Sequence, residues 1–195
     1  MKKAEVTRLN ILQKAFELIY MKGYQATSID EIIASTAVTK GAFFYHFKNK
    51  EEMGLAMIKE VMHPGMSPYM IQVLGRTNNP IDDIYNMIKD LLLLNPFFKV
   101  AYGCPAVNLI EEMAPLNDSF KKALSHLMLE WQHAIEKTLE KAQLDGQLNS
   151  TFKPKQVALY ITVSYSGVRN IGKIMGEKSY VAFLEQFKVY LQSLN

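Results

Sequence analysis

The chain has 195 residues, 49% hydrophobic and 21% charged, which is the composition of a globular protein with one or two domains and a sizeable core. No stretch approaches 18 consecutive apolar residues, so we expect no membrane span, and a single cysteine excludes an intrachain disulfide framework. The formal net charge of +3 does not by itself indicate nucleic acid. The charged N-terminus predicts no signal peptide, and the single cysteine fits a reducing, cytoplasmic location.

The first predicted helix covers residues 5–22, where apolar residues recur with helical spacing, and Gly23 ends it. Ser28 followed by Glu31 is a capping box, which predicts that a second helix starts there. The segment at 35–37 favours a turn. Together these signals predict a short capped helix followed by a tight turn.

Thr39 is the expected N-cap of a third helix, in which Phe43 and Phe47 pack inward. Asn49 with Glu52 is another capping signal, from which a fourth helix is expected. Two helices joined by a turn of about four residues form the arrangement that places the second helix in the DNA major groove. A DNA-binding helix-turn-helix is therefore the leading hypothesis.

Residues 37–50 contain Lys40, Lys48 and Lys50 and no acidic residue, which is the local basic surface that phosphate contacts require. We expect Lys40 to bind a guanine edge, and the hydroxyl and basic groups around it to contact phosphates. The complete predicted set of DNA-contacting residues is Thr27, Ser28, Thr39, Lys40, Gly41, Ala42, Phe44, Tyr45, His46 and Lys50.

The same segment follows a specific pattern, Thr27-x-x-x-x-Ile32 and then Ala37-Val38-Thr39-Lys40-Gly41-Ala42-Phe43-Phe44-Tyr45-His46-Phe47-x-x-Lys50-Glu51. It resembles the N-terminal domain of the TetR family of bacterial repressors, over roughly the first 60 residues. The resemblance implies a homodimer that binds double-stranded operator DNA and is released by a small-molecule inducer. One position departs from it: the family usually has a tyrosine at Phe44, whose hydroxyl commonly reaches a DNA phosphate. Tyr45, His46 or Lys50 would then supply the backbone contacts.

The fourth helix is expected to end near Met62, because His63-Pro64-Gly65 interrupts it and predicts a hinge. We place the domain boundary there, between a DNA-binding domain at residues 1–63 and a ligand-binding and dimerisation domain at residues 64–195. Further helices are expected at 81–95, 105–114, 118–144, 154–175 and 177–194. The predicted fold is all-α, with an N-terminal three-helix helix-turn-helix domain and a C-terminal helical domain.

Cys104 stands between Gly103 and Pro105, where it is the expected N-cap of a helix. The positive end of a helix dipole lowers the pKa of a thiol, which favours a reactive cysteine; the alternative is a small buried residue. Residues 103–112 also resemble the Gly-Cys segment of one TetR subgroup, in which that thiol senses electrophiles such as N-ethylmaleimide. This second resemblance implies that Lys173 lies near the thiol.

The ligand pocket is expected among apolar and methionine side chains of the converging helices, each of which alternatively belongs to the core. Arg169 stands in an apolar segment, where it meets an anionic ligand or pairs with Glu111 or Glu112. The predicted ligand and sensor residues are Cys104, Met87, Leu91, Met113, Met128, Trp131, Tyr165, Arg169 and Lys173.

The last two predicted helices each have an apolar side, and two such helices from each protomer form a four-helix interface. The alternative is that these sides pack on their own domain. The predicted interface residues are Val157, Tyr160, Ile161, Ser164, Val168, Phe187, Tyr190 and Leu191.

Two other functions remain as alternatives. A helical enzyme is disfavoured, because the chain has no Gly-rich phosphate loop, no His-Glu-x-x-His and no nucleophile elbow. A ligand carrier that has lost DNA binding is favoured only by Phe44. His126, Glu130 and His133 share one helical face but have no evident fourth ligand, so no metal or cofactor is expected.

Overall fold

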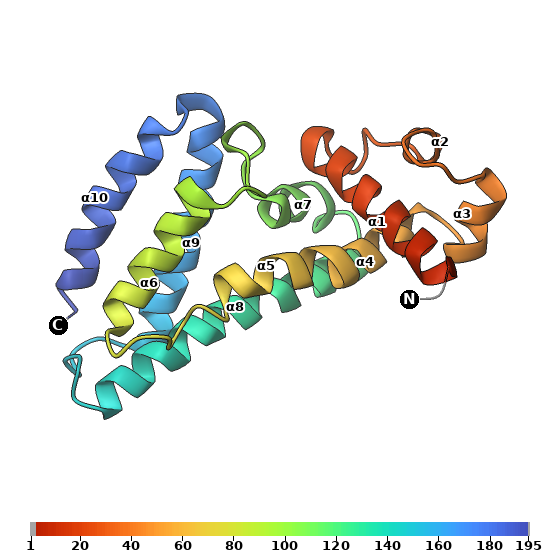
Figure 1. Cartoon of the computed structure of the whole chain (residues 1–195). Helices are drawn as coiled ribbons and strands as arrows, with labels where there is room; N and C mark the ends of the chain where they lie inside the picture. The colour runs from red at the N-terminus through yellow and green to blue at the C-terminus, as the bar shows by residue number, and fades with distance from the viewer. Residues whose placement is uncertain (1–2, 195) are drawn as a thin grey trace. The chain divides into compact units, whose positions relative to one another are not determined.

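The computed structural model describes residues 3–194, which fold into helices and connecting turns (Figure 1). No strand occurs among these residues, which confirms the predicted all-α class. Within the same part of the chain, no helix combines the length and apolar character needed to cross a membrane. The chain forms two compact units: residues up to Met66 with Pro105–Leu127, and Ser67–Cys104 with the chain from Met128 onward.

The first unit contains the predicted helix-turn-helix, and its helix bounds agree with the sequence analysis. It comprises α1 (Lys3–Lys22), α2 (Ile29–Ala34), α3 (Lys40–His46), α4 (Lys50–Met57), the π-helical segment η1 (Ile58–Met62), α7 (Pro105–Met113) and the start of α8 (Asp118–Leu144). Its core includes Ile11, Leu12, Ile32, Phe43 and Met53, all fully buried. Gly54 admits the rings of Tyr24 and Phe120, because a Cβ there would lie 2.7 Å from Phe120 Cζ.

The predicted interruption at His63-Pro64-Gly65 is wrong. A further helix, α5 (His63–Met70), begins directly after η1, and it contains Pro68 as well as Pro64. In η1 the His63 N–H donates to the Ile58 carbonyl five residues back, so the hydrogen-bond register widens immediately before the proline. A widened turn accommodates a residue that has no N–H, and the helix therefore continues through Pro64. The domain boundary at residue 63 stays a prediction.

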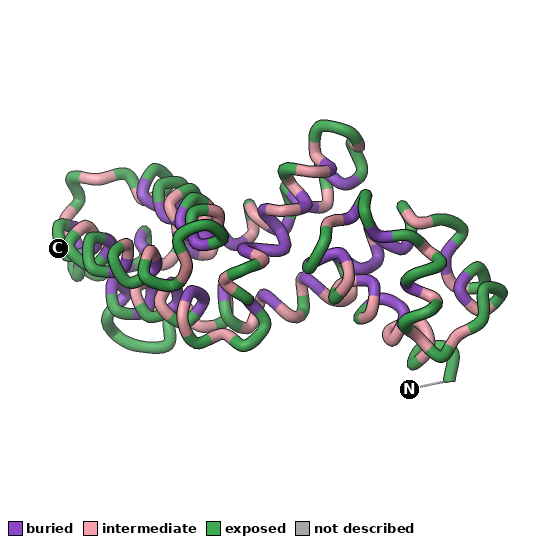
Figure 2. The backbone as a smooth tube through the Cα atoms, turned by 90° about the horizontal axis from the view of Figure 1, so that it is seen from above, coloured by how far each residue is buried: buried purple, intermediate pink, exposed green. Residues whose placement is uncertain are grey.

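The second unit is built from α6 (Pro80–Lys89), the π-helical η2 (Asp90–Leu94), the short 3₁₀ helix η3 (Val100–Tyr102), the remainder of α8, α9 (Pro154–Met175) and α10 (Lys178–Gln192). Within it α9 packs against α10 and η3, and α10 also packs against α6 (Figure 1). Buried and exposed residues alternate along the helices, so that each helix has one side turned inward (Figure 2). The largest fully buried side chains of this unit are Trp131, Arg169, Tyr165 and Tyr180.

Candidate functional site

Three local capping interactions fix the helix-turn-helix, as the sequence predicted. The Ser28 hydroxyl accepts from the Glu31 N–H at 3.1 Å, and the Glu31 carboxylate accepts from the Ser28 N–H at 2.8 Å, which completes the capping box. Thr39 caps α3 by accepting from the Ala42 N–H at 3.2 Å, and Asn49 caps α4. These bonds set where α2, α3 and α4 begin.

The two faces of α3 differ sharply. Phe43 is fully buried and Phe47 is 1% exposed, whereas Phe44 is 45% and Tyr45 79% exposed. Lys40 and Gly41 are also exposed, while Ala42 and His46 are half-buried. An apolar inner face and an exposed outer face bearing a lysine and two aromatic rings fit a helix that is held by the core and presented to a ligand.

The basic groups of this surface have partners of their own. Lys40 Nζ lies 3.1 Å from Asp30 Oδ1 in an exposed ion pair. Lys50 Nζ donates to the Tyr24 carbonyl at 2.5 Å and lies 4.3 Å from the Tyr24 ring centroid. Burial lowers the pKa of Lys50, the main effect at a half-buried ammonium. The structure therefore directs Lys50 towards the α1–α2 turn.

Two other predicted contact residues are constrained by burial. Thr27 is fully buried and its hydroxyl donates to the Gly23 carbonyl at 2.7 Å, so it supports the turn and offers no group to DNA. Burial, together with the nearby charge of Arg8, lowers the pKa of His46 below its ordinary value of 6.5, which disfavours the charged imidazolium.

Sequence analysis missed Arg8. Its guanidinium donates to both Glu60 carboxylate oxygens, at 3.0 and 2.7 Å, and to the His46 carbonyl at 3.1 Å. The guanidinium also lies 4.4 Å from the Phe47 ring centroid. Arg8 thus joins α1 to the end of α3 and to η1. The rarity of arginine could have drawn attention to this residue, because the chain has three arginines and nineteen lysines.

Glu112 holds the turn that precedes α2. Its carboxylate accepts from the backbone N–H groups of Tyr24 at 2.8 Å and Gln25 at 2.6 Å. Gly23 adopts a φ of +95°, and a Cβ there would lie 3.1 Å from the same carboxylate. The suggestion that Glu112 pairs with Arg169 is therefore wrong, because its oxygens bind backbone donors of the first unit.

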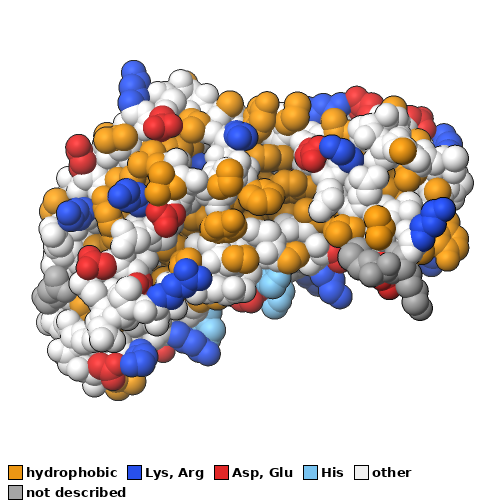
Figure 3. Space-filling view, in the orientation of Figure 1, with side chains coloured by type: hydrophobic (Ala, Val, Ile, Leu, Met, Phe, Trp, Pro, Cys, Tyr) orange, Lys and Arg blue, Asp and Glu red, His pale blue; other side chains and the backbone are white. Residues whose placement is uncertain are grey.

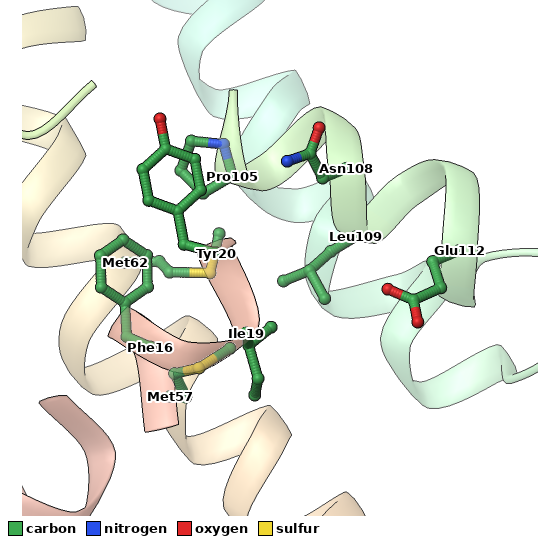
Figure 4. Close-up of a pocket in the computed structure, with 9 residues that line it drawn as sticks. All are labelled: Phe16, Ile19, Tyr20, Met57, Met62, Pro105, Asn108, Leu109 and Glu112. Carbon is green, nitrogen blue, oxygen red and sulfur yellow. The ribbon is translucent and has the colours of Figure 1, made fainter. Parts of the chain in front are cut away.

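An apolar recess, lined in part by Glu112, lies between α1, the α4–η1 segment and α7 (Figure 4). Carbon and sulfur atoms form most of its wall, and the Glu112 carboxylate and the Asn108 amide stand on α7 (Figure 4). The lining residues are Phe16, Ile19, Tyr20, Met57, Met62, Pro105, Asn108, Leu109 and Glu112. None of them was a predicted ligand residue.

The Gly103–Cys104 segment meets α9 within the second unit. Cys104 is 1% exposed, and Pro105 begins α7 as predicted. Gly103 has a φ of +69°, and its carbonyl accepts from Arg169 Nη2. A Cβ on Gly103 would lie 2.3 Å from Lys173 Cε, so the lysine side chain covers this glycine. The structure thus brings Arg169 and Lys173 to the segment that carries the thiol.

The remaining predicted pocket residues are buried or half-buried. Trp131 Nε1 lies 3.5 Å from Met87 Sδ, and the Trp131 and Tyr165 rings meet edge to face at 5.2 Å. Leu91 is fully buried and Met128 half-buried in the same unit. Met113, also buried, belongs to α7 in the first unit.

The predicted dimer residues lie mostly on the inner sides of α9 and α10. Five of the eight are buried against their own unit: Val157, Ile161, Val168, Phe187 and Leu191. Tyr160 is 49% exposed, and Ser164 and Tyr190 are half-buried. For these five residues the alternative interpretation therefore holds: their side chains pack within their own unit. Sequence periodicity found the more apolar side of each helix, which is the side that the core covers.

A second apolar side of α9 is exposed, and the sequence analysis did not single it out. Val163 is 61%, Ile171 47% and Ile174 86% exposed, and Leu159 and Met175 exceed 50%. Gly167 lies in the middle of this stripe with open space around its Cα. By contrast, charged and apolar side chains are interspersed on the face that α6 and α10 present (Figure 3).

The possible metal site does not form. His133 Nδ1 lies 3.3 Å from Glu136 Oε2 on the same helix. Among residues 3–194, no group of three potential ligands is arranged to hold a metal ion.

The comparisons with known proteins agree with this architecture. Residues 11–57 match the model of bacterial regulatory proteins of the tetR family, and residues 83–187 match the tetracyclin repressor-like C-terminal domain. The second match covers more than half of the chain. The chain belongs to the TetR family. It is a DNA-binding transcriptional regulator and not an enzyme, and TetR-family regulators act as dimers that respond to small-molecule ligands.

Individual relatives support this assignment. An HTH-type transcriptional regulator from the lacX 3′ region of Lactococcus lactis is 34% identical over 133 residues, 68% of each chain. The repressor NemR of Escherichia coli is 22% identical over 173 residues, 86% of this chain and 84% of NemR. The crystal structure of its reduced form aligns with a TM-score of 0.82 over 96% of each chain. A TetR regulator from Cytophaga hutchinsonii aligns with 0.89 at 18% identity, over 100% of this chain and 98% of its own.

Proposed function

We propose that the protein is a cytoplasmic repressor that inserts α3 into the major groove of a palindromic operator. The observation that carries this proposal is the division of α3 into a buried face, Phe43 and Phe47, and an exposed face. Lys40 is the first residue of α3 and the only lysine on that helix. When DNA binds, its ammonium group leaves the exposed ion pair with Asp30 and contacts a base edge or a phosphate. Tyr45 and the exposed Lys48 supply phosphate contacts in place of Thr27 and Lys50.

The dimer interface in this proposal is the exposed stripe of α9. Large apolar side chains at 159, 163, 171 and 174 lose water contact when a second copy covers them, and Gly167 lets the two helices approach closely. Val163→Glu places a charge in the stripe and is expected to yield monomers by light scattering. Leu144→Glu, at an 87% exposed position at the end of α8, is the matched control and should remain dimeric. If the Val163→Glu protein is still a dimer, the exposed stripe of α9 is not the dimer interface.

The sensor in this proposal is Cys104, and α7 carries its signal. Cys104 directly precedes α7, and Glu112 near the end of α7 holds the N–H groups of Tyr24 and Gln25. That turn leads within three residues to Ser28, the cap of α2. Modification of the thiol, or occupation of its surroundings by an inducer, would displace α7 and release this turn. A coupling free energy of about 1–3 kcal/mol suffices for a tenfold loss of operator affinity.

Selection from a random duplex DNA library with the purified protein, at a stated salt concentration, tests operator binding. Enrichment of an inverted repeat is the expected result, since two protomers present two copies of α3. If folded protein enriches no sequence, the repressor proposal is wrong and the ligand-carrier alternative replaces it.

A further inference from the structure

Arg169 is a buried cation, two of whose nitrogens are left without a hydrogen bond by the described residues. It is fully buried on α9, and Nη2 donates to the Gly103 carbonyl. The other two nitrogens, Nε and Nη1, have no hydrogen-bond partner in the described part of the chain. A neutral carbonyl does not balance the charge of a guanidinium, and a buried charge without a partner carries a large desolvation cost. A protein retains such a group where something else supplies the acceptor.

The surroundings of Arg169 are aromatic and add a further donor. Its guanidinium carbon lies 5.3 Å from the Phe98 ring centroid and 5.5 Å from that of Tyr180. The Tyr180 hydroxyl is buried, which raises its pKa, while the neighbouring Arg169 guanidinium opposes that effect; no hydrogen bond of good geometry satisfies the hydroxyl among the described residues. Gly172 makes this packing possible, since a Cβ there would lie 2.3 Å from Tyr180 Cε1. The ring is thereby held against α9 one turn from Arg169.

The unsatisfied groups define the chemistry that would satisfy them. Arginine nitrogens are donors only, and a tyrosine hydroxyl readily donates, so the missing group is an acceptor. One guanidinium requires one negative charge, and the apolar rings favour a small monoanion over a strongly hydrated dianion. Of the two acidic residues that the sequence suggested as partners, Glu111 and Glu112, the second is bound to Tyr24 and Gln25.

We propose that Arg169 and Tyr180 form the anion subsite for an effector that carries a carboxylate. The inference rests on the proposed effector response and names the chemical class of the effector. Because Arg169 binds the carbonyl of Gly103, the carboxylate is held beside the segment that carries Cys104. Arg169 is fully buried and the side chain of the exposed Lys173 covers Gly103, so binding of an effector requires local movement of these side chains. Carboxylate effectors and electrophiles thus act at one place.

Thermal unfolding of the full chain in propanoate or propanamide, at equal concentration and ionic strength, tests the subsite. Propanoate is expected to raise Tm and its neutral isostere to leave it unchanged, because only the native state offers the site. Inorganic phosphate is expected to have a smaller effect than propanoate. Arg169→Met should abolish the shift, while Lys155→Met, which removes an exposed charge from the same helix, should retain it. Equal shifts for propanoate and propanamide, or a shift retained by Arg169→Met, would overturn the subsite.

A second measurement needs no variant. Iodoacetate and iodoacetamide alkylate the single cysteine by the same step: the thiol proton goes to water, the S–C bond forms, and iodide leaves with the C–I electron pair. The two reagents are similar in size and meet the same steric restriction at the buried Cys104, so the ratio of their rates cancels that restriction; desolvation alone would disfavour the anionic iodoacetate. Relative to the ratio for free glutathione, we expect at least tenfold enrichment of iodoacetate. An unchanged ratio would show that Arg169 offers no subsite for carboxylates. It would leave operator binding, measured separately by the DNA selection, unaffected.

Discussion

The helix-turn-helix and the Gly103–Cys104 segment are held in place in opposite ways. Ser28, Thr39 and Asn49 each cap a helix through a backbone N–H three residues away. Gly103 is instead held by a buried arginine 66 residues away in the sequence. The helix caps of the first region are satisfied by residues close in the sequence. The second region retains donors that nothing in the described part of the chain satisfies.

This difference between the two regions indicates which of them is suited to respond to a ligand. A reading helix benefits from fixed ends and a fixed register, because base contacts depend on exact placement. A sensor benefits from groups that are incompletely satisfied, because a ligand then changes their free energy most. The following substitutions sharpen or break this comparison, and they run from the largest expected effect to the smallest.

Phe43→Ala removes a fully buried ring from the core beneath α3. We expect it to lower the free energy of unfolding by about 3–5 kcal/mol, the usual cost of such a cavity. Phe44→Ala, on the next residue but 45% exposed, is expected to change it by less than about 0.5 kcal/mol. Urea denaturation followed by circular dichroism measures both. Similar losses in the two variants would contradict the division of α3 into inner and outer faces.

Lys40→Ala removes the lysine at the start of α3 without touching the core. The expected loss is about 1–3 kcal/mol of operator binding if the lysine contacts a base edge, with stability unchanged. Titration of the selected operator by fluorescence anisotropy measures it. Lys155→Ala, at an exposed position of α9, controls for net charge, and equal losses in both variants would remove Lys40 from the contact surface.

Glu31→Gln tests the capping box through pH. The hydrogen bond from Lys22, with further bonds from Ser28, lowers the pKa of Glu31 from 4.5 to about 2. Because the folded value is depressed, the stabilising contribution is complete above pH 4.5 and is lost as pH falls towards 2. The stability difference between wild type and Glu31→Gln should therefore shrink between pH 4.5 and 2. Glu140→Gln, at an exposed position of α8, is the control, and a difference independent of pH would exclude this origin.

The sequence predicted the bounds of nearly every helix and all three caps, because these depend on residues within one turn of each other. It could not predict the bonds from Arg8 to Glu60, from Tyr24 to Glu112 or from Arg169 to Gly103. These pairs are 52, 88 and 66 residues apart, and no local pattern marks them. Lys173 was associated with the Gly-Cys segment only through the family resemblance, and Arg169 was not associated with it before the structure showed its bond to Gly103.

The errors have equally physical causes. The break predicted at Pro64 failed because a π-helical turn accommodates the proline, a tertiary outcome that proline content alone does not reveal. The dimer residues were taken from the most apolar side of each terminal helix, and that side packs on its own unit. Because α9 has two apolar sides, only the structure shows which of them stays exposed.

The most direct test of the account is operator affinity before and after treatment with N-ethylmaleimide, in wild type and Cys104→Ser. The wild type should lose about tenfold or more in affinity, which corresponds to about 1.4 kcal/mol of coupling, whereas Cys104→Ser should bind equally well before and after. Release of the serine variant to the same extent, or no release of a wild type shown to be alkylated, would contradict control of α3 from Cys104 through α7.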